Sequence, residues 1–228
     1  MDRYDKERLV EIVLYVLNKT GELDYYTLLK TIYFAELKHL AKWGQRITAD
    51  DVCAMPYGPV LSHLLDAIKG DSHEPELSRM LKSAFKFASE DASNIMLPLR
   101  QANEDYLSES EKEALDASIL ENASLSFEQI KNKSHDKIWL KNYREGKGQK
   151  VISTMDLAES AHASEAMKEY IKAYRDIKNS LDTAEEKGRK KGKMEGKIEV
   201  TREMLQDGEP IEKIARYTGL SENEISEL

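Results

Sequence analysis

The chain has 228 residues, of which 40% are hydrophobic, 33% are charged and only 7% are aromatic, and its formal net charge is -8. This length and apolar content are sufficient for one domain with a substantial core and an appendage. The acidic excess argues against a chain that wraps nucleic acid with its whole surface, because phosphate backbones attract clustered Lys and Arg. Any contact with nucleic acid is expected to be local.

The only cysteine, Cys53, excludes an intramolecular disulfide and a four-thiolate zinc site. The first residues are charged, and no apolar run approaches the ~20 residues that cross a bilayer. We therefore expect a cytoplasmic protein without a membrane segment. A composition rich in charge and poor in aromatics favours helices with wide solvated faces, so the expected fold class is mainly α.

Two amphipathic helices are expected at the start of the chain. Apolar residues recur at three- and four-residue spacing over residues 8–18, and Gly21 follows as a stop. Asp24 is suited to cap the second helix, whose apolar stripe continues to Trp43 and is interrupted by Glu36. The two helices are expected to pack as an antiparallel hairpin.

The Gly58-Pro59 step predicts the start of a third helix. A residue before proline is kept out of the α region, whereas proline itself suits the first helical turn. The helix is expected to begin at Pro59 and to bury Val60, Leu61, Leu64, Leu65 and Ile68. The preceding residues 52–55 are expected to be extended.

The middle of the chain predicts a small β ribbon and short helices. Residues 85–87 and 95–99 are short apolar runs that can pair, with Pro98 placing the second run at an edge. Ser108 and Glu111 form a capping-box pattern, which predicts a helix after them. Ser126 is expected to start another short helix, and a further helical segment is expected around residues 155–161. The complete fold is then a multi-helix globular domain with a small β ribbon.

Beyond residue 166 the chain is polar and strongly helical, and Gly188, Gly192 and Gly196 recur every four residues. Each glycine costs a helix ~1 kcal/mol relative to alanine. The spacing indicates either close approach of another helix or a flexible joint, and we favour the joint. We therefore predict a first domain over residues 1–182 and a tail over residues 183–228.

The tail has a helix-turn-helix outline. Pro210 opens a helix, Gly219 turns the chain and Ser221 caps a last helix. That last helix carries three glutamates and no Lys or Arg, whereas base reading in DNA relies chiefly on Arg, Lys, Asn and Gln. Direct DNA reading is therefore the weaker interpretation, and helical self-association or docking is the stronger one. DNA contacts, if made, would come from Arg189, Lys190, Lys191 and Asn223.

Several short motifs resemble a known family. They are Leu-Lys-x-x-Tyr-Phe-Ala at residues 29–35, His-Leu at 39–40, Gly-x-x-Ile-Thr at 44–48, Tyr-Gly-Pro-Val at 57–60, and the pattern of Ser134, His135 and Trp139. Together they resemble the Panacea domain, a SocA-like module of antitoxins in bacterial toxin–antitoxin pairs, over roughly residues 10–174. The tail carries Gly-Lys-x-Glu-Gly-Lys at residues 192–197 and Ile-Ala-x-x-Thr-Gly-Leu-Ser-x-x-Glu-Ile at 214–225. These two motifs resemble the C-terminal end of Rpn-like transposase nucleases, whose catalytic core is not evident here.

The Panacea resemblance implies an antitoxin that binds and neutralises a co-encoded toxin by direct protein contact. Two alternatives stay open, which are a transcriptional autoregulator that uses the tail on its own promoter and an adaptor that delivers the toxin to a protease. A homo-oligomer is a further partner that the tail leaves open. The residues expected at the partner surface are Tyr33, His39, Trp43, Tyr57, Gly58, Pro59, His135 and Trp139.

These residue types also have a plainer interpretation, because aromatic residues in a small domain are more often core than interface. Trp43 at a helix end and Tyr57 on a turn are the best candidates for partial exposure. No two of the five histidines have zinc-helix spacing on a common predicted face, and no phosphate loop, paired-carboxylate motif or nucleophile elbow is present. We expect no metal, no cofactor and no catalytic residues.

Overall fold

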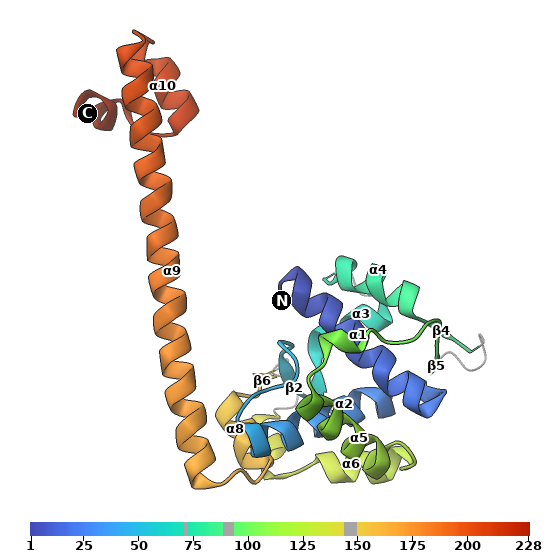
Figure 1. Cartoon of the computed structure of the whole chain (residues 1–228). Coiled ribbons are helices and arrows are strands. Elements are labelled where there is room, and N and C mark those ends of the chain that lie inside the picture. Colours follow the sequence, from blue (N-terminus) through green and yellow to red (C-terminus); the bar gives the residue numbers. More distant parts are fainter. Residues whose placement is uncertain (71–72, 89–93, 144–149) are drawn as a thin grey trace. The chain divides into compact units, whose positions relative to one another are not determined.

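The computed structural model describes residues 1–70, 73–88, 94–143 and 150–228, and it confirms a mainly helical fold with small antiparallel sheets (Figure 1). It divides into two compact units, Met1–Lys172 and Ala173–Leu228. This division comes before the boundary predicted near Asp182. Because helix α9 contributes residues to both units, the change from one unit to the other occurs within a helix.

The first unit contains helices and strands in mixed order. They are α1 (Arg3–Thr20), β1 (Leu23–Asp24), α2 (Tyr25–Trp43), β2 (Val52–Met55), β3 (Gly58–Leu61), α3 (Ser62–Lys69), α4 (Pro75–Ala84), β4 (Phe85–Phe87), β5 (Ile95–Pro98), the 3-10 turn η1 (Glu104–Tyr106), α5 (Glu109–Asn122), α6 (Phe127–Ser134), α7 (Lys137–Asn142), β6 (Lys150–Val151), α8 (Thr154–Ser160) and the start of α9 (Glu165–Gln206). The second unit contains the rest of α9, α10 (Ile211–Thr218) and α11 (Glu222–Ser226).

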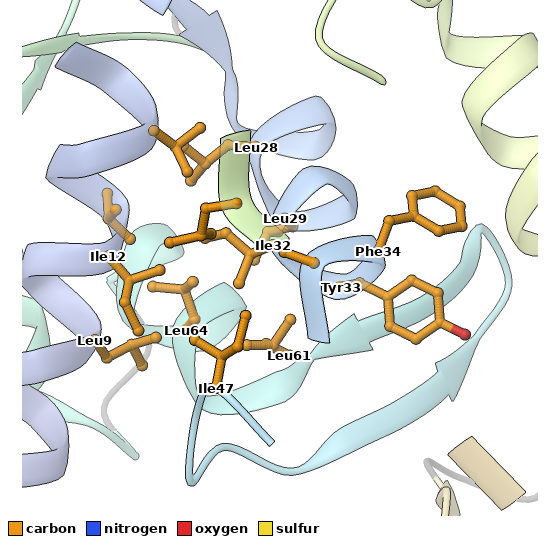
Figure 2. Packing of buried hydrophobic residues seen from close by; sticks show 14 of the residues in the cluster. Leu9, Ile12, Leu28, Leu29, Ile32, Tyr33, Phe34, Ile47, Leu61 and Leu64 are labelled. Atoms are coloured by element: carbon orange, nitrogen blue, oxygen red, sulfur yellow. The ribbon is translucent and has the colours of Figure 1, made fainter. Parts of the chain in front are cut away.

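Helix α2 is the central element of the first unit, and it is buried along most of its length. Asp24 caps it as predicted, accepting a hydrogen bond from the Thr27 backbone N–H at 3.0 Å, and the left-handed Gly44 ends it. Apolar residues of α1 and α2 meet in the core shown in Figure 2, together with Ile47 and residues of β3 and α3. The principal helical neighbour of α2 is α5, so the predicted α1–α2 hairpin is not its main packing.

Glu36, which interrupts the apolar stripe of α2, is buried and has a structural role. Its carboxylate accepts the backbone N–H groups of Ile47 at 2.9 Å and Thr48 at 3.0 Å, and it lies 3.1 Å from the Arg46 guanidinium. A buried carboxylate is tolerated when it is paired and hydrogen-bonded in this way. Glu36 therefore holds the Gly-x-x-Ile-Thr segment against α2.

The helix predicted to begin at Pro59 begins instead at Ser62, which corrects that prediction. Gly58 and Pro59 belong to β3, which pairs antiparallel with β2, and β2 also pairs with β6. Proline is tolerated here because β3 lies at the edge of the sheet. The buried carboxylate of Asp50 accepts the N–H groups of His63 and Leu64 at 3.0 and 2.9 Å, and thereby fixes the start of α3.

The predicted ribbon of residues 85–87 and 95–99 is confirmed as β4 paired with β5. One detail is wrong, since β5 is the central strand of the order β1-β5-β4 and not an edge. Pro98 is accommodated because β1 reaches only Met96 and Ile95, which leaves the proline paired on one side.

In the second unit, α9 runs without a break through Gly188, Gly192 and Gly196, so the joint expected at these glycines is not a break in the helix. The helix-turn-helix outline is confirmed, with Pro210 before α10, a left-handed Gly219 and a capping box at Ser221. Its small core contains Ile214, Leu220 and Ile225, with Met204, Leu205 and Ala215 packed against them. In the described part of the chain, no helix has the length and apolarity that crossing a membrane requires.

Candidate partner-binding site

The Tyr57-Gly58-Pro59 turn lies against a buried lysine from α2. Lys30 is only 1% exposed, and its Nζ donates a hydrogen bond to the Pro59 carbonyl at 2.6 Å. The same Nζ lies 5.5 Å from the centre of the Tyr26 ring. Burial lowers the pKa of Lys30 to about 7, because a desolvated ammonium is disfavoured. The motif containing Lys30 was noted in the sequence, but no role was predicted for this residue.

Gly58 allows the turn to approach the lysine. Its φ of +95° lies in the left-handed region, and a β-carbon here would stand 2.5 Å from Lys30 Nζ and 2.4 Å from Ser134 Oγ. Only glycine has neither the conformational nor the steric penalty at such a position. Gly58 and Pro59 are buried, so their role is to place the turn and not to present side chains.

A stack of three rings also supports the turn. His135 and Trp139 stack with ring centres 3.7 Å apart, and Trp139 and Tyr143 stack at 4.9 Å. The Trp139 indole N–H donates to the Met55 carbonyl at 2.9 Å, at the end of β2. Burial, followed by the charges of Lys30 and Lys131, lowers the pKa of His135. His135 and Trp139 are half-buried and hold the β2–β3 turn in place.

The exposed part of the turn is aromatic. Tyr57 is 60% exposed and lies edge-to-face with Phe127, which is 44% exposed, at a ring-centre distance of 5.7 Å. The ring centres of Tyr26 and Phe127 are 4.6 Å apart, and the Tyr26 hydroxyl donates a hydrogen bond to the Tyr57 carbonyl at 2.8 Å. We call Tyr26, Tyr57 and Phe127 the aromatic rim. No role was predicted for Phe127, although its place directly after the helix cap Ser126 indicates a position near the surface.

Trp43 lies at the C-terminal end of α2 and is 47% exposed, as predicted. Its neighbour His39 is buried, and the two His39 ring nitrogens lie 2.8 Å from the Gln45 carbonyl and 3.1 Å from Ser110 Oγ. A shallow pocket of about 190 Å³ adjoins both residues. His39 is therefore a structural histidine, while Trp43 presents its ring to solvent.

Tyr33 is 1% exposed and does not present a surface. Figure 2 shows Tyr33 and Phe34 directed to the opposite side of α2 from Leu9 and Ile12. The Tyr33 hydroxyl lies 3.4 Å from Ser160 Oγ, which in turn hydrogen-bonds the Asp136 carboxylate, and burial raises the pKa of Tyr33. A pocket of about 460 Å³ adjoins this network, lined by Tyr33, Phe34, Lys38, Lys133, Ser160 and His162 among others.

The eight residues predicted for the partner surface thus have different positions. Gly58, Pro59, His135 and Trp139 come together around Lys30 and form the support of the site. Tyr57 extends from that support, and Trp43 lies separately at the end of α2. Tyr33 and His39 are buried, at 1% and 4% exposure, so neither ring is available to a partner in this structure.

The residues named for DNA contacts do not form a basic face. Arg189, Lys190 and Lys191 are exposed on α9, but Lys190 pairs with Glu186 at 2.7 Å and Lys191 with Glu195 at 3.7 Å. Asn223 is in the first turn of α11 between Glu222 and Glu224. Acidic neighbours reduce the attraction for phosphate at both places.

The fold and the site together describe a mainly helical domain with a supported aromatic turn on its surface. Residues 28–140 match the family model described as antitoxin SocA-like, Panacea domain. The matched segment contains Lys30, His135, Trp139 and two residues of the aromatic rim, Tyr57 and Phe127, whereas Tyr26 lies just before it. The match supports the resemblance found in the motifs. No curated protein and no solved structure matches the chain. The resemblance of the tail to the end of Rpn-like nucleases stays a prediction.

Proposed function

We propose that the protein is an antitoxin that binds a co-encoded toxin and neutralises it by direct contact, with the aromatic rim as an anchor. The observation that carries this proposal is the exposure of Tyr57, on a turn held by Lys30, together with the exposure of Phe127 at the start of α6 beside it. The match of residues 28–140 to an antitoxin family supports it. The mechanism is occlusion of the toxin's working surface, which requires no bond to be made or broken and therefore no catalytic residue.

The physical basis of the anchor is its rigidity together with its apolar area. Aromatic residues bury a large area on binding while keeping a polar atom for a hydrogen bond, and they are enriched among the residues that dominate binding energy. The hydrogen bond from Tyr26 to Tyr57 and the ring contacts with Phe127 order the rim before a partner arrives. Ordering in advance reduces the entropy lost on binding.

The test is rescue of growth when the chain is co-expressed with the product of the neighbouring reading frame. Tyr57→Ala and Phe127→Ala are each expected to weaken toxin binding by roughly 2 kcal/mol, which is the scale of an interface hot spot. Tyr4→Ala is the matched control, because Tyr4 is 58% exposed and stacks on Tyr106 away from the rim. Full rescue and unchanged affinity in both rim variants, with normal folding, would remove the rim from the proposal.

Trp43 is a second anchor in this proposal, since its exposed ring lies beside a shallow pocket. Trp43→Ala is expected to leave the free energy of unfolding within about 1 kcal/mol of wild type, because half-exposed side chains contribute little to the core. Toxin affinity, measured by calorimetry, is expected to fall. An unchanged affinity would confine the contact surface to the rim.

The two alternative functions make different predictions. An autoregulator would shift its own promoter in a gel, and deletion of residues 183–228 would abolish the shift. An adaptor would shorten the lifetime of the toxin in cells, whereas simple occlusion would leave toxin abundance unchanged or higher. The mixed charges of α9 and α11 are the reason that we rank DNA binding below neutralisation.

A further inference from the structure

Within the second unit, α9 carries an apolar stripe that faces solvent. Ile177 is 61% exposed and Leu181 is 64% exposed, although both are large aliphatic residues. Ala184 and Gly188 continue the stripe at the same alternating spacing of three and four residues. A β-carbon at Gly188 would meet nothing within 4 Å. This spacing is the heptad pattern by which helices pair.

Within the second unit, residues 177–196 of α9 have no buried side chain among the residues that the structure describes. Residues 173–196 are all exposed, and most helical stability in proteins comes from packing of an apolar face and not from the helix itself. Three glycines in this segment further lower its intrinsic helical stability. A second helix laid along Ile177 and Leu181 would supply the missing packing.

The charges beside the stripe indicate what that second helix is. Lys178 and Glu185 occupy the same flanking position of successive heptads, seven residues apart. Neither forms an ion pair with any residue that the structure describes. Farther along the helix, Lys190 pairs with Glu186 and Lys191 pairs with Glu195. In an antiparallel pair of identical helices, equivalent flanking positions of this kind face each other.

We propose that a second copy of this chain pairs with this segment of α9 in an antiparallel arrangement. In the register that we infer, Leu181 lies opposite the partner's Ala184, and Ile177 lies opposite the partner's Gly188. Large side chains thus meet small ones in each layer, and Lys178 faces the partner's Glu185. Because the pair has twofold symmetry, each of these contacts occurs twice.

The charges select this register over its neighbours. Moving one helix by one heptad in one direction places Lys178 opposite the partner's Lys178. Moving it in the other direction places Glu185 opposite the partner's Glu185. Both shifts replace attraction by repulsion at the twofold axis, which disfavours them. In a parallel pair, Lys178 would face the partner's Ala173 and Glu185 would face the partner's Ser180. Both of these residues are uncharged, so the parallel pair gains no attraction between charges.

The first measurement is the mass of the full chain by sedimentation equilibrium over a range of concentrations. Wild type is expected to be a dimer at micromolar concentration, and Leu181→Glu is expected to weaken the dimer roughly 100-fold, because a carboxylate would enter the apolar layer. Lys193→Glu is the control, because it introduces a glutamate on the outer face of the same helix, and it is expected to leave the dimer unchanged. Circular dichroism checks that each variant keeps its helical content.

The second measurement tests the antiparallel register. Lys178→Glu and Glu185→Lys are each expected to weaken the dimer roughly tenfold at low salt, because two attractions become two repulsions. The double variant K178E/E185K restores opposite charges and is expected to regain most of the wild-type affinity. In a parallel dimer this mutual rescue would not occur.

Three results would overturn the proposal. A wild-type monomer throughout the micromolar range excludes the pairing, and a dimer that tolerates Leu181→Glu forms elsewhere on the chain. Failure of the double charge reversal to recover the loss of the single ones excludes the antiparallel register. None of these measurements involves the toxin, so they succeed or fail independently of the proposed antitoxin function.

Discussion

Gly58 stands so close to Lys30 that a β-carbon at position 58 would lie 2.5 Å from the lysine Nζ. The same β-carbon would lie 2.4 Å from Ser134 Oγ, so three separate segments of the domain meet at this point. The Lys30 ammonium then reaches the next residue, Pro59, through its carbonyl. The shape of the aromatic rim depends on this contact.

We predict that Gly58→Ala destabilises the domain by ~3 kcal/mol or more, combining strain at a positive φ with displacement of buried polar groups. Gly70→Ala is the matched control, because Gly70 is left-handed with a φ of +75° but has no atom within 4 Å of an added β-carbon. The control isolates the conformational strain, which is expected to cost ~1 kcal/mol. Chemical denaturation of both variants measures the difference, and equal losses would show that the contact with Lys30 is unimportant.

The second prediction concerns pH and Lys30. Its pKa is about 7 in the folded protein and near 10.5 in the unfolded chain, so between these values the unfolded chain binds the additional proton. The free energy of unfolding therefore rises as pH increases from about 7 towards 10, by up to ~1 kcal/mol per pH unit. Below pH 7 both states are protonated, and this contribution does not change with pH.

Replacement of Lys30 by Met is expected to remove this rise while filling a similar volume. The measurement is denaturant unfolding of wild type and Lys30→Met between pH 7 and 9.5, with the difference between the two taken at each pH. The difference cancels the titration of other lysines and tyrosines. Parallel pH profiles in the two proteins would contradict a buried, easily deprotonated Lys30.

The third prediction concerns Glu36, whose carboxylate receives the N–H groups of Ile47 and Thr48. In Glu36→Gln a side-chain NH₂ replaces one acceptor oxygen and faces these donors, so we expect a loss of ~2–4 kcal/mol in the free energy of unfolding. Glu113→Gln removes an exposed partner of Lys42 and is expected to cost less than ~0.5 kcal/mol. Similar losses in both variants would show that Glu36 has no special role.

The fourth prediction concerns the glycines of α9. Gly196 lies inside the helix with open space where a β-carbon would be, so Gly196→Ala is expected to stabilise α9 by ~1 kcal/mol. Amide hydrogen exchange of residues around position 196 measures the change, with slower exchange expected in the variant. Unchanged or faster exchange would support the flexible joint that the sequence favoured.

Local signals predicted the parts of the fold that depend on neighbouring residues. Asp24, Ser108 and Ser126 each cap a helix as expected, because capping is decided within four residues of the cap. The predicted start of α3 was wrong, because residues that are distant in the sequence decide where this helix begins. Pairing of β3 with β2 draws residues 58–61 into a strand, and the carboxylate of Asp50 then fixes the helix start at Ser62.

The candidate site was predictable only in outline. The Tyr57 turn and Trp43 were identified as exposed aromatics, since a turn and a helix end are surface positions. Lys30 was not identified, because a lysine within a helix normally projects into solvent. Its burial follows from the arrival of β3 and α6 on the same face of α2, which no spacing in α2 itself reveals.

Strand β6 closes the β2–β3 sheet from far along the chain, and the Ile152 N–H donates to the Val52 carbonyl at 2.8 Å. The ribosome must have added both Val52 and Ile152 before this hydrogen bond can form. At bacterial rates of translation the second position follows the first by roughly 5–20 s. The nascent chain therefore has an interval during synthesis in which the sheet that carries the Tyr57 turn lacks strand β6, and the proposed binding surface is expected to be complete only after that interval.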